Sequence, residues 1–268
     1  MVPGAITGSN GASTDQPADY PADASSGNQL DPCWRDGNGD NCWNWFLPGH
    51  QGRGAGEPAI IAGITRAVMA DTTQWTIDPA RVYVAGMSAG GAMAVILGAT
   101  YPDLYSAVAA HSALEYKAAT DVPSAFQALA QGGPDPAGQG QQAFAAMGNH
   151  ARLMPVLDVQ GTNDLRVAPV NGDQVIQQWL ETNRLATGGT FTRQFSTPTT
   201  DTRFSEATPG GHPYRVRTWS DNRGKVVHEY WTVDGMGHAW SGGYWLGSFA
   251  DPRGPSVTRA MYSFFYQH

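Results

Sequence analysis

Ser88 lies in the segment of this chain that is best suited to covalent chemistry. Residues 82–87 form an apolar run typical of a buried strand, and small apolar residues follow from Ala89 onward in a helical pattern. The two runs meet at Gly-x-Ser-x-Gly, with glycines two positions on either side of the serine. This pattern is typical of a nucleophile elbow, a sharp strand-to-helix turn that exposes a serine. The alternative is an ordinary turn serine between two closely packed elements.

A serine becomes a nucleophile when a base takes its proton and a carboxylate fixes the tautomer of that base. In α/β sheets such groups lie just beyond the carboxyl ends of strands. Asp164 follows a predicted strand over residues 154–159, and His238 follows another over 226–233. The chain order is then serine, acid, histidine, as in other enzymes with an elbow of this kind. The sequence therefore predicts Ser88, Asp164 and His238 as a catalytic triad.

Other residues compete for the roles of acid and base. Asp164 could instead cap a helix that begins near Pro169, and Asp158 could be the acid, although an unpaired carboxylate within an apolar strand is costly. Among the histidines, His228 alternates within a strand, where it would face solvent or a neighbour. His212 lies in a Gly-Gly-His-Pro sequence that favours a turn.

Several side chains near these positions are candidates for contact with a substrate. Trp240, Tyr244 and Trp245 follow the predicted base closely, and His111 follows a predicted central strand. Trp43 belongs to the aromatic cluster at residues 42–46. For Trp43 and His111, a place in the core is the alternative interpretation.

The segments expected to position these residues alternate between strands and helices. Helices are predicted from Glu57, with a stripe of Ile60, Ile61, Ile64 and Val68, then directly after Ser88, from near Val170, and over 257–265. Strands are predicted at 82–87, 107–110 and 154–159, with paired strands at 214–219 and 226–233. Residues 121–149 are interpreted as an insertion with helical fragments over the edge of the sheet. The alternation predicts an α/β fold with a mostly parallel sheet flanked by helices.

Composition limits the class of protein. With 268 residues the chain suits one sizeable domain, and we expect a loop-rich or partly disordered segment over 1–40 followed by a catalytic domain over 41–268. The net charge of −7 argues against nucleic acid as a partner. No run approaches the roughly 18 apolar residues of a membrane span.

The two cysteines, Cys33 and Cys42, are separated by a short loop rich in Gly, Asn and Asp. A zinc site needs four ligands, and no nearby pair of His or Cys residues supplies the others. A local disulfide is therefore expected, which indicates an oxidising compartment; two thiols in a reducing compartment are the alternative. Residues 1–4 show neither the basic start nor the apolar core of a signal peptide.

Four segments resemble the poly(3-hydroxybutyrate) depolymerase family of esterases, which includes feruloyl and acetylxylan esterase relatives. They are residues 42–46, 54–61, the elbow at 83–93, and 235–243; residues 161–170 also match the family pattern. The resemblance runs from about Tyr20 to the C-terminus. It implies an α/β-hydrolase fold, secretion, the triad named above, and a backbone N–H of Ala89 that binds the oxyanion.

One departure from the family pattern concerns the N-terminal strands. Family members carry an early strand that ends in a His-Gly-Cys turn, which supplies a second oxyanion donor and a cysteine. Residues 1–19 contain neither, so we expect the sheet to lack the usual N-terminal strands and Cys33 to replace that cysteine. Either the sequence is a shortened form of a longer protein or another loop provides the donor.

The function expected from the residues and the resemblance together is that of a serine esterase that needs no metal or organic cofactor. The resemblance implies short hydroxyacid esters or polyhydroxyalkanoate as the substrate. The alternatives are a carbohydrate esterase of the feruloyl or acetylxylan type and a catalytically silent binding module of the same fold. The sequence carries no signal for the oligomeric state.

Overall fold

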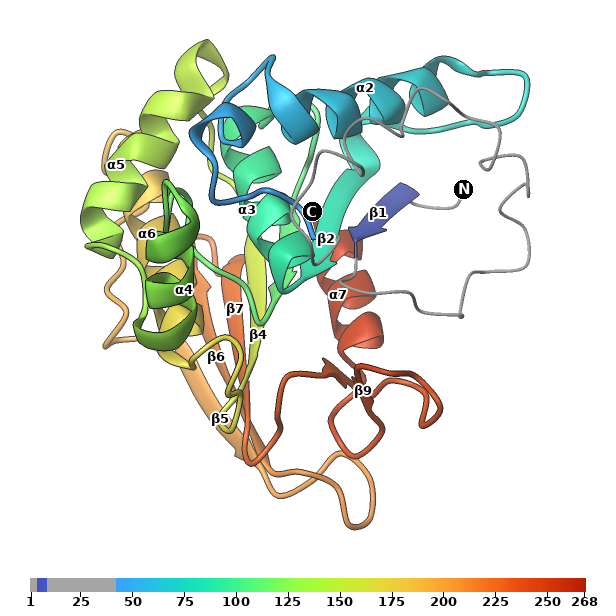
Figure 1. Ribbon diagram of the computed structural model, residues 1–268, viewed down its shortest axis with the longest axis vertical. Coiled ribbons are helices and arrows are strands. Elements are labelled where there is room, and N and C mark those ends of the chain that lie inside the picture. The colour runs from blue at the N-terminus through green and yellow to red at the C-terminus, as the bar shows by residue number, and fades with distance from the viewer. Residues whose placement is uncertain (1–3, 9–41) are drawn as a thin grey trace.

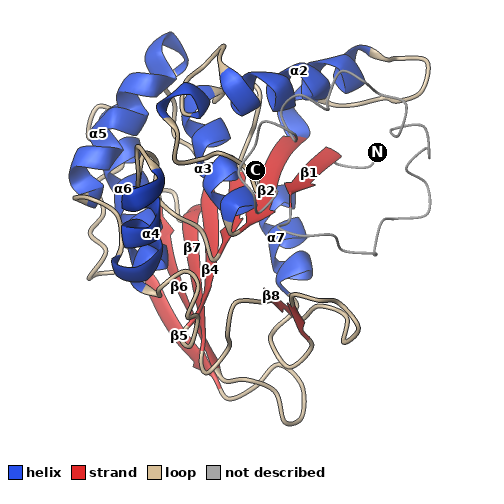
Figure 2. Cartoon of the chain, viewed as in Figure 1, coloured by secondary structure: helices blue, strands red, loops and turns tan. Residues whose placement is uncertain are grey.

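The computed structural model describes residues 4–8 and 42–268, which build a central seven-stranded sheet (Figures 1 and 2). In spatial order its strands are β1 (Gly4–Gly8), β2 (Val82–Met87), β3 (Val108–His111), β4 (Val156–Gly161), β7 (Val226–Val233), β6 (Tyr214–Ser220) and β5 (Thr200–Phe204). The first five are parallel, and β6 and β5 extend the sheet in antiparallel fashion. The predicted α/β fold with a mostly parallel sheet is therefore confirmed.

The strand β1 differs from what the sequence led us to expect. No strand was predicted within residues 1–19, whereas Gly4–Gly8 pairs in parallel with β2 and places Gly8 level with Gly86. The segment has only Ile6 and Thr7 as residues that favour strands, between two glycines, and is too short for a recognisable alternation. The rest of the expected N-terminal segment, residues 9–41, lies outside the described residues.

Helices cover both faces of the sheet. One face carries α3 (Ala89–Thr100) and α6 (Val170–Ala186), with α2 (Gly56–Ala70), α4 (Val122–Gln131) and α5 (Pro136–Met147) packed around them. The other face carries α7 (Val257–Tyr266), whose Phe265 stacks on Tyr83 of β2 with ring centroids 4.6 Å apart. Alternation along β2 explains the two cores, because Val82 and Val84 face α3 while Tyr83 and Ala85 face α7.

The helices match their predicted positions but not all of their predicted faces. In α2 the stripe residues Ile64 and Val68 are exposed, whereas Ile61 is buried as predicted, together with Ala62 and Thr65. Every residue of α3 is buried, since α2 and α5 pack on it from outside. The predicted insertion forms α4 and α5, and α5 packs on α6 and α3 as an outer helical layer rather than over the sheet edge.

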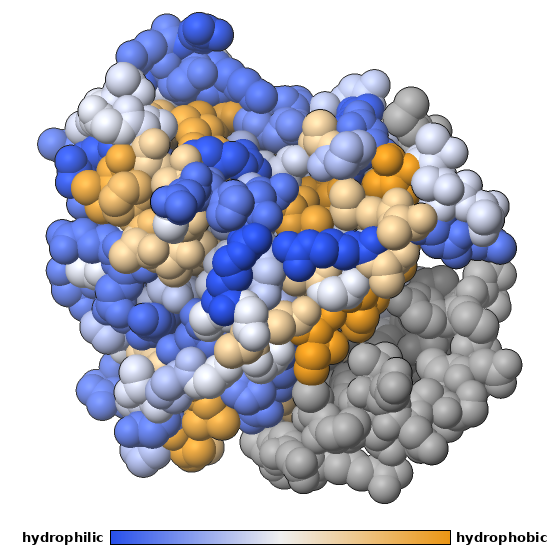
Figure 3. Space-filling view, turned by 90° about the horizontal axis from the view of Figure 1, so that it is seen from above, coloured by the Kyte–Doolittle hydropathy of each residue, from blue (hydrophilic) through white to orange (hydrophobic). Residues whose placement is uncertain are grey.

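Loops at the carboxyl end of the parallel strands form the lower part of the molecule in Figure 1. They include a short parallel pair of strands, β8 (Trp240–Ser241) and β9 (Ala250–Asp251). The opposite end, seen in Figure 3, shows hydrophilic residues mixed with smaller hydrophobic areas. Within residues 42–268, no helix combines the length and the apolar character needed to cross a bilayer.

Candidate active site

Ser88 occupies the turn between β2 and α3 in a strained backbone conformation, with φ 57° and ψ −125°. Non-glycine residues with positive φ are uncommon and cost about 1–3 kcal/mol when they lie in sparsely populated regions. Two hydrogen bonds hold the turn: Ser88 N–H donates to His111 O at 2.9 Å, and Ala92 N–H donates to Ser88 O at 2.9 Å. The structure thus places Ser88 at the sharp strand-to-helix turn that the elbow pattern predicts.

The glycines around Ser88 are required by the close approach of β2 and α3. A Cβ at residue 86 would overlap the carbonyl group of Gly90, and a Cβ at residue 91 would lie 2.8 Å from the Cβ of Ala113. The backbone N–H of Ala89 belongs to the first turn of α3, where N–H groups have no partner within the helix. A developing negative charge beside Ser88 would meet these groups and the positive end of the helix dipole.

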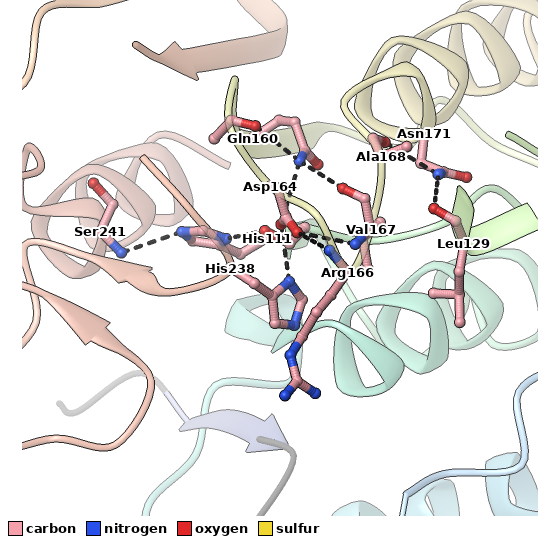
Figure 4. Close-up of polar contacts among 12 residues, drawn as sticks. His111, Leu129, Gln160, Asp164, Arg166, Val167, Ala168, Asn171, His238 and Ser241 are labelled. Carbon is pink, nitrogen blue, oxygen red and sulfur yellow. Dashed lines mark hydrogen bonds and ion pairs between the residues drawn. The ribbon is translucent and has the colours of Figure 1, made fainter. Parts of the chain in front are cut away.

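Asp164 and His238 come together from the loops that follow β4 and β7 (Figure 4). The Nδ1 atom of His238 lies 2.8 Å from Asp164 Oδ2, although 74 residues separate them in sequence. The second carboxylate oxygen of Asp164 accepts the backbone N–H groups of Arg166 and Val167, each at 2.9 Å. The loop and the histidine therefore fix the carboxylate from opposite sides.

The charge of Asp164 is stabilised by these bonds. Burial by itself would raise the pKa of the Asp164 carboxyl, but the hydrogen bonds from His238, Val167 and Arg166 outweigh it and hold the pKa below its usual value. An ionised Asp164 favours the tautomer of His238 with a proton on Nδ1, which leaves Nε2 as the proton acceptor.

The competing acid, Asp158, lies elsewhere. It is fully buried in β4 and faces α6, where a Cβ at Gly172 would lie 2.9 Å from Asp158 Oδ2 and 2.6 Å from the Tyr230 hydroxyl. Burial raises the pKa of Asp158 well above its ordinary value, which favours the protonated carboxyl over the carboxylate. Asp164, and not Asp158, is the carboxylate bonded to His238.

The competing histidines have partners of their own. His228 is fully buried, its Nε2 lies 3.0 Å from Asn183 Nδ2, and burial lowers its pKa to about 3. His212 Nε2 lies 2.9 Å from Asp251 Oδ2, a His–Asp pair that no sequence pattern predicts. This second pair anchors β9 to the turn at Gly-Gly-His-Pro.

His111 links the elbow to the loop that follows His238. It has no exposed surface, its Nε2 accepts Ser241 N–H at 3.2 Å, and its ring stacks on Trp240 with centroids 5.4 Å apart. Burial, and next to it the nearby His238, lower the pKa of His111 to about 3, so the ring is neutral. His111 was a candidate for substrate contact, but the structure places it beneath the site as a support.

The aromatic candidates differ in how they are placed. Trp240 is half-buried and donates from Nε1 to Thr258 Oγ1 of α7 at 2.9 Å. Trp43 is half-buried against the core beside α2 and α3, as in the core interpretation. Tyr244 and Trp245 are 60% and 68% exposed.

One aromatic contact was missed from the sequence. The ring of Phe249 meets His238 edge to face with centroids 6.3 Å apart. The segment that contains Phe249 shows no periodicity, so only the folded loop brings this ring to the histidine.

The predicted disulfide and possible metal ligands are the remaining features of the site region. Cys42 is half-buried, but its predicted partner Cys33 lies outside the described residues, so the disulfide stays a prediction. Within residues 42–268, no cluster of three or more His, Cys, Asp or Glu side chains is arranged to hold a metal ion.

Comparison with known proteins adds to this geometry. The family model described as Esterase PHB depolymerase matches residues 32–199, a range that contains Ser88 and Asp164 and ends before His238. Poly(3-hydroxyalkanoate) depolymerase C of Paucimonas lemoignei is 32% identical over 210 residues, which cover 77% of this chain and 46% of that protein. Acetylxylan esterase of Coprinopsis cinerea is 29% identical over 169 residues, covering 59% and 43%. The chain thus spans less than half the length of either relative.

A solved structure shows the same fold. Acetyl xylan esterase from Aspergillus awamori superimposes with a TM-score of 0.64 at 19% identity, covering 86% of this chain and 75% of that one. At this identity the likeness concerns the fold, with its central sheet and flanking helices.

Proposed function

Since the chain belongs to the Esterase PHB depolymerase family, we propose that it is a serine esterase that hydrolyses carboxylic esters through Ser88, His238 and Asp164. The observation that carries this proposal is the bond between His238 Nδ1 and Asp164 Oδ2 at 2.8 Å, at the sheet edge where β2 ends in Ser88. His111 connects the two parts, because its carbonyl binds Ser88 N–H and its ring lies near His238.

The residues give each step of the reaction a group to perform it. Ser88 Oγ attacks the ester carbonyl while His238 Nε2 takes the hydroxyl proton, and Asp164 stabilises the imidazolium that results. The N–H of Ala89 donates to the oxyanion of the tetrahedral intermediate. Collapse of that intermediate releases the alcohol with the proton from His238. Water, deprotonated by His238, then attacks the acyl-enzyme, and the carboxylic acid leaves as Ser88 regains its proton.

We propose short hydroxyacid esters or polyhydroxyalkanoate as the substrate. The relative from Paucimonas lemoignei, a poly(3-hydroxyalkanoate) depolymerase by name, supports this choice over a long aligned region. The acetylxylan esterase from Coprinopsis cinerea supports a carbohydrate ester as the second candidate. Turnover of hydroxybutyrate oligomers compared with methyl ferulate and acetylated xylan separates the two. A polyester particle outside the cell can be reached only by a secreted protein, so the first candidate with an extracellular polymer as substrate also implies secretion.

The test of catalysis is hydrolysis of p-nitrophenyl butyrate by the wild-type protein and by Ser88→Ala. We expect kcat/KM to fall by about a thousandfold or more, because the variant lacks the nucleophile. Ser106→Ala is the matched control: that hydroxyl bonds to Ala80 O at the amino end of β3, far along the strand from the site. Equal activity of wild type and Ser88→Ala would contradict the proposal and favour a silent binding module.

A further inference from the structure

Three large apolar side chains stand exposed at the tip of one loop near His238. The loop spans residues 242–249, hereafter the apolar loop, and its Tyr244, Trp245 and Leu246 are 60%, 68% and 63% exposed. Soluble proteins seldom display large adjacent side chains of this kind unless the surface binds something. In Figure 1 the loop lies beside β9, at the end of the molecule opposite α2.

The base of the apolar loop is fixed on both sides. Trp240 N–H donates to Phe249 O at 2.7 Å, and Gly242 N–H donates to Asp251 O at 2.8 Å. The strand β8 below it is held by Ser241, whose N–H binds His111 and whose hydroxyl donates to Pro255 O at 2.7 Å. The exposed tip is therefore presented by a support that also carries the candidate active site.

The apolar loop is continuous with the surroundings of His238. Phe249, at the end of the loop, contacts the His238 ring, and the guanidinium of Arg166 lies over Phe249 at 5.4 Å from its centroid. Next to Asp164 in the chain, Leu165 is 91% exposed. Apolar side chains thus follow directly after the acid on one loop and lead away from the base on the other.

The composition of the apolar loop identifies the kind of partner. Residues 239–250 contain no charged residue, although the whole chain carries a net charge of −7. Aromatic rings pack on methylene and methyl groups, while the Tyr hydroxyl and the Trp N–H can donate to ester carbonyls. A charged polymer would be met by side chains of opposite charge at such a surface. A stable protein partner needs about 800 Å² of buried surface on each side, more than three side chains at the tip of one loop offer. An uncharged, water-insoluble chain of esters fits it better.

We propose that the apolar loop docks the protein on the surface of a solid aliphatic polyester, so that ester groups of the polymer reach Ser88 and His238. This rests on the proposed esterase function and assigns to Tyr244, Trp245 and Leu246 a role that soluble esters do not require. Docking buries the three side chains against the polymer, and the site is held at the interface.

Adsorption is measured in the Ser88→Ala background, so that cleavage does not alter the film. Binding to films of poly(3-hydroxybutyrate) is compared between this parent and the variant that adds Tyr244→Ser, Trp245→Ser and Leu246→Ser. We expect the adsorption constant to fall at least about tenfold, because three large apolar contacts are lost. The matched control adds Ile64→Ser, Val68→Ser and Trp75→Ser at the opposite end of the molecule. These residues are 42%, 44% and 58% exposed, and we expect the adsorption constant of this control to equal that of the parent.

Hydrolysis by the loop variant with Ser88 intact separates docking from catalysis. We expect film degradation to fall with adsorption, by at least about fivefold more than kcat/KM for p-nitrophenyl butyrate falls. Unchanged adsorption overturns the docking role and leaves the esterase in place. An equal loss on the soluble ester also overturns it, as does a shift from dimer to monomer on mutation, which would make a second copy the occupant. Absence of soluble-ester activity in the wild type counts against the esterase, and adsorption still decides the docking role.

Discussion

Asp164 uses its two oxygens for different purposes. One binds His238, and the other binds the backbone of its own loop through Arg166 and Val167. An asparagine at this position can keep the backbone contacts through its amide oxygen, but its NH₂ group then faces His238 and reverses the direction of that hydrogen bond. Replacing Asp164 by asparagine therefore tests the role of its negative charge.

The first prediction concerns Asp164→Asn. An amide that presents its NH₂ group to Nδ1 would force the Nδ1 atom of His238 to accept a hydrogen bond, which moves the ring proton to Nε2 and leaves no base for Ser88. We expect kcat on p-nitrophenyl butyrate to fall by about a thousandfold to ten-thousandfold. Asp158→Asn is the control, because Asp158 faces Gly172 of α6 rather than His238 and burial favours its neutral form, so the variant should keep the wild-type activity. Comparable losses in both variants would argue against Asp164 as the partner of the base.

At the scale of residues, a position after a strand predicted which side chains meet at the site, whereas the burial of each side chain could not be predicted. Asp164 and His238 were predictable because each directly follows an apolar run, and the parallel sheet brings such positions to one edge. His111 follows a strand as well, yet its neighbours Ser241 and Trp240 lie 130 and 129 residues further along the chain and cover it completely. Whether a residue lines a site or supports it depends on such distant loops, which no local pattern reveals.

At the scale of elements, the packing of β2 against α3 determines where Ser88 points. The two backbones approach so closely at Gly86 and Gly90 that no side chain fits between them. Such contact leaves the turn at Ser88 little freedom, so the strained φ of 57° is maintained by the elements on either side.

The second prediction compares two glycine-to-alanine changes. Gly86→Ala would press a methyl group into the carbonyl of Gly90, and we expect a loss of at least about 3 kcal/mol in the free energy of unfolding together with loss of activity. Gly63→Ala, in the exposed middle of α2, has open space around it and should stabilise the protein by about 0.5–1 kcal/mol. Urea unfolding of the two variants measures both effects. A well-folded and active Gly86→Ala protein would show that the elements can separate without harm.

The type of each strand and helix could be predicted from the sequence more reliably than which of its faces is buried. The strands and helices around the elbow appear where the apolar patterns placed them, because each pattern is long enough to show its period. In α2 the exposure of Ile64 and Val68 could not be foreseen, since the buried face shares only Ile61 with the predicted stripe and continues through Ala62 and Thr65. The strand β1 has five residues and no period of its own; its pairing with β2 is a tertiary effect.

Across the whole molecule, buried ionisable groups give stability two opposite dependences on pH. Burial lowers the pKa values of His111 and His228 to about 3. As pH falls below about 6.5, these two histidines are therefore protonated in the unfolded chain but stay neutral in the folded protein, which lowers stability. Burial raises the pKa of Glu115 to about 9, with Asp135 adding to the effect, and that of Asp158 well above its usual value. Glu115 therefore stays protonated in the fold at neutral pH and ionises on unfolding, and the raised pKa of Asp158 acts in the same direction.

The sign follows for each range of pH. A group with a raised pKa in the fold contributes stability that is complete below its unfolded pKa and is lost as pH rises towards its folded pKa. Above about pH 6.5 His111 and His228 are neutral in both states, so the buried carboxyls with raised pKa values, Glu115 and Asp158 among them, make stability fall with rising pH. Below about pH 6.5 the two histidines lower stability as pH falls, whereas the carboxyls raise it. We therefore expect maximum stability on the mildly acidic side of neutrality.

The third prediction tests this with Glu115→Gln. Both oxygens of Glu115 are buried without a hydrogen-bond partner within the described residues, and ionisation there costs up to about 1.4 kcal/mol per pH unit. From pH 6.5 to 8.5 we expect the unfolding free energy of wild type to fall, and that of the variant to fall by about 1–3 kcal/mol less. At pH 5 the two should lie closer together. The exposed Glu206→Gln serves as the control and should follow wild type throughout. Urea unfolding curves for wild type and Glu115→Gln that keep a constant separation from pH 5 to 8.5 would show that Glu115 is ionised in the folded protein, because only a change of protonation on unfolding makes the difference depend on pH.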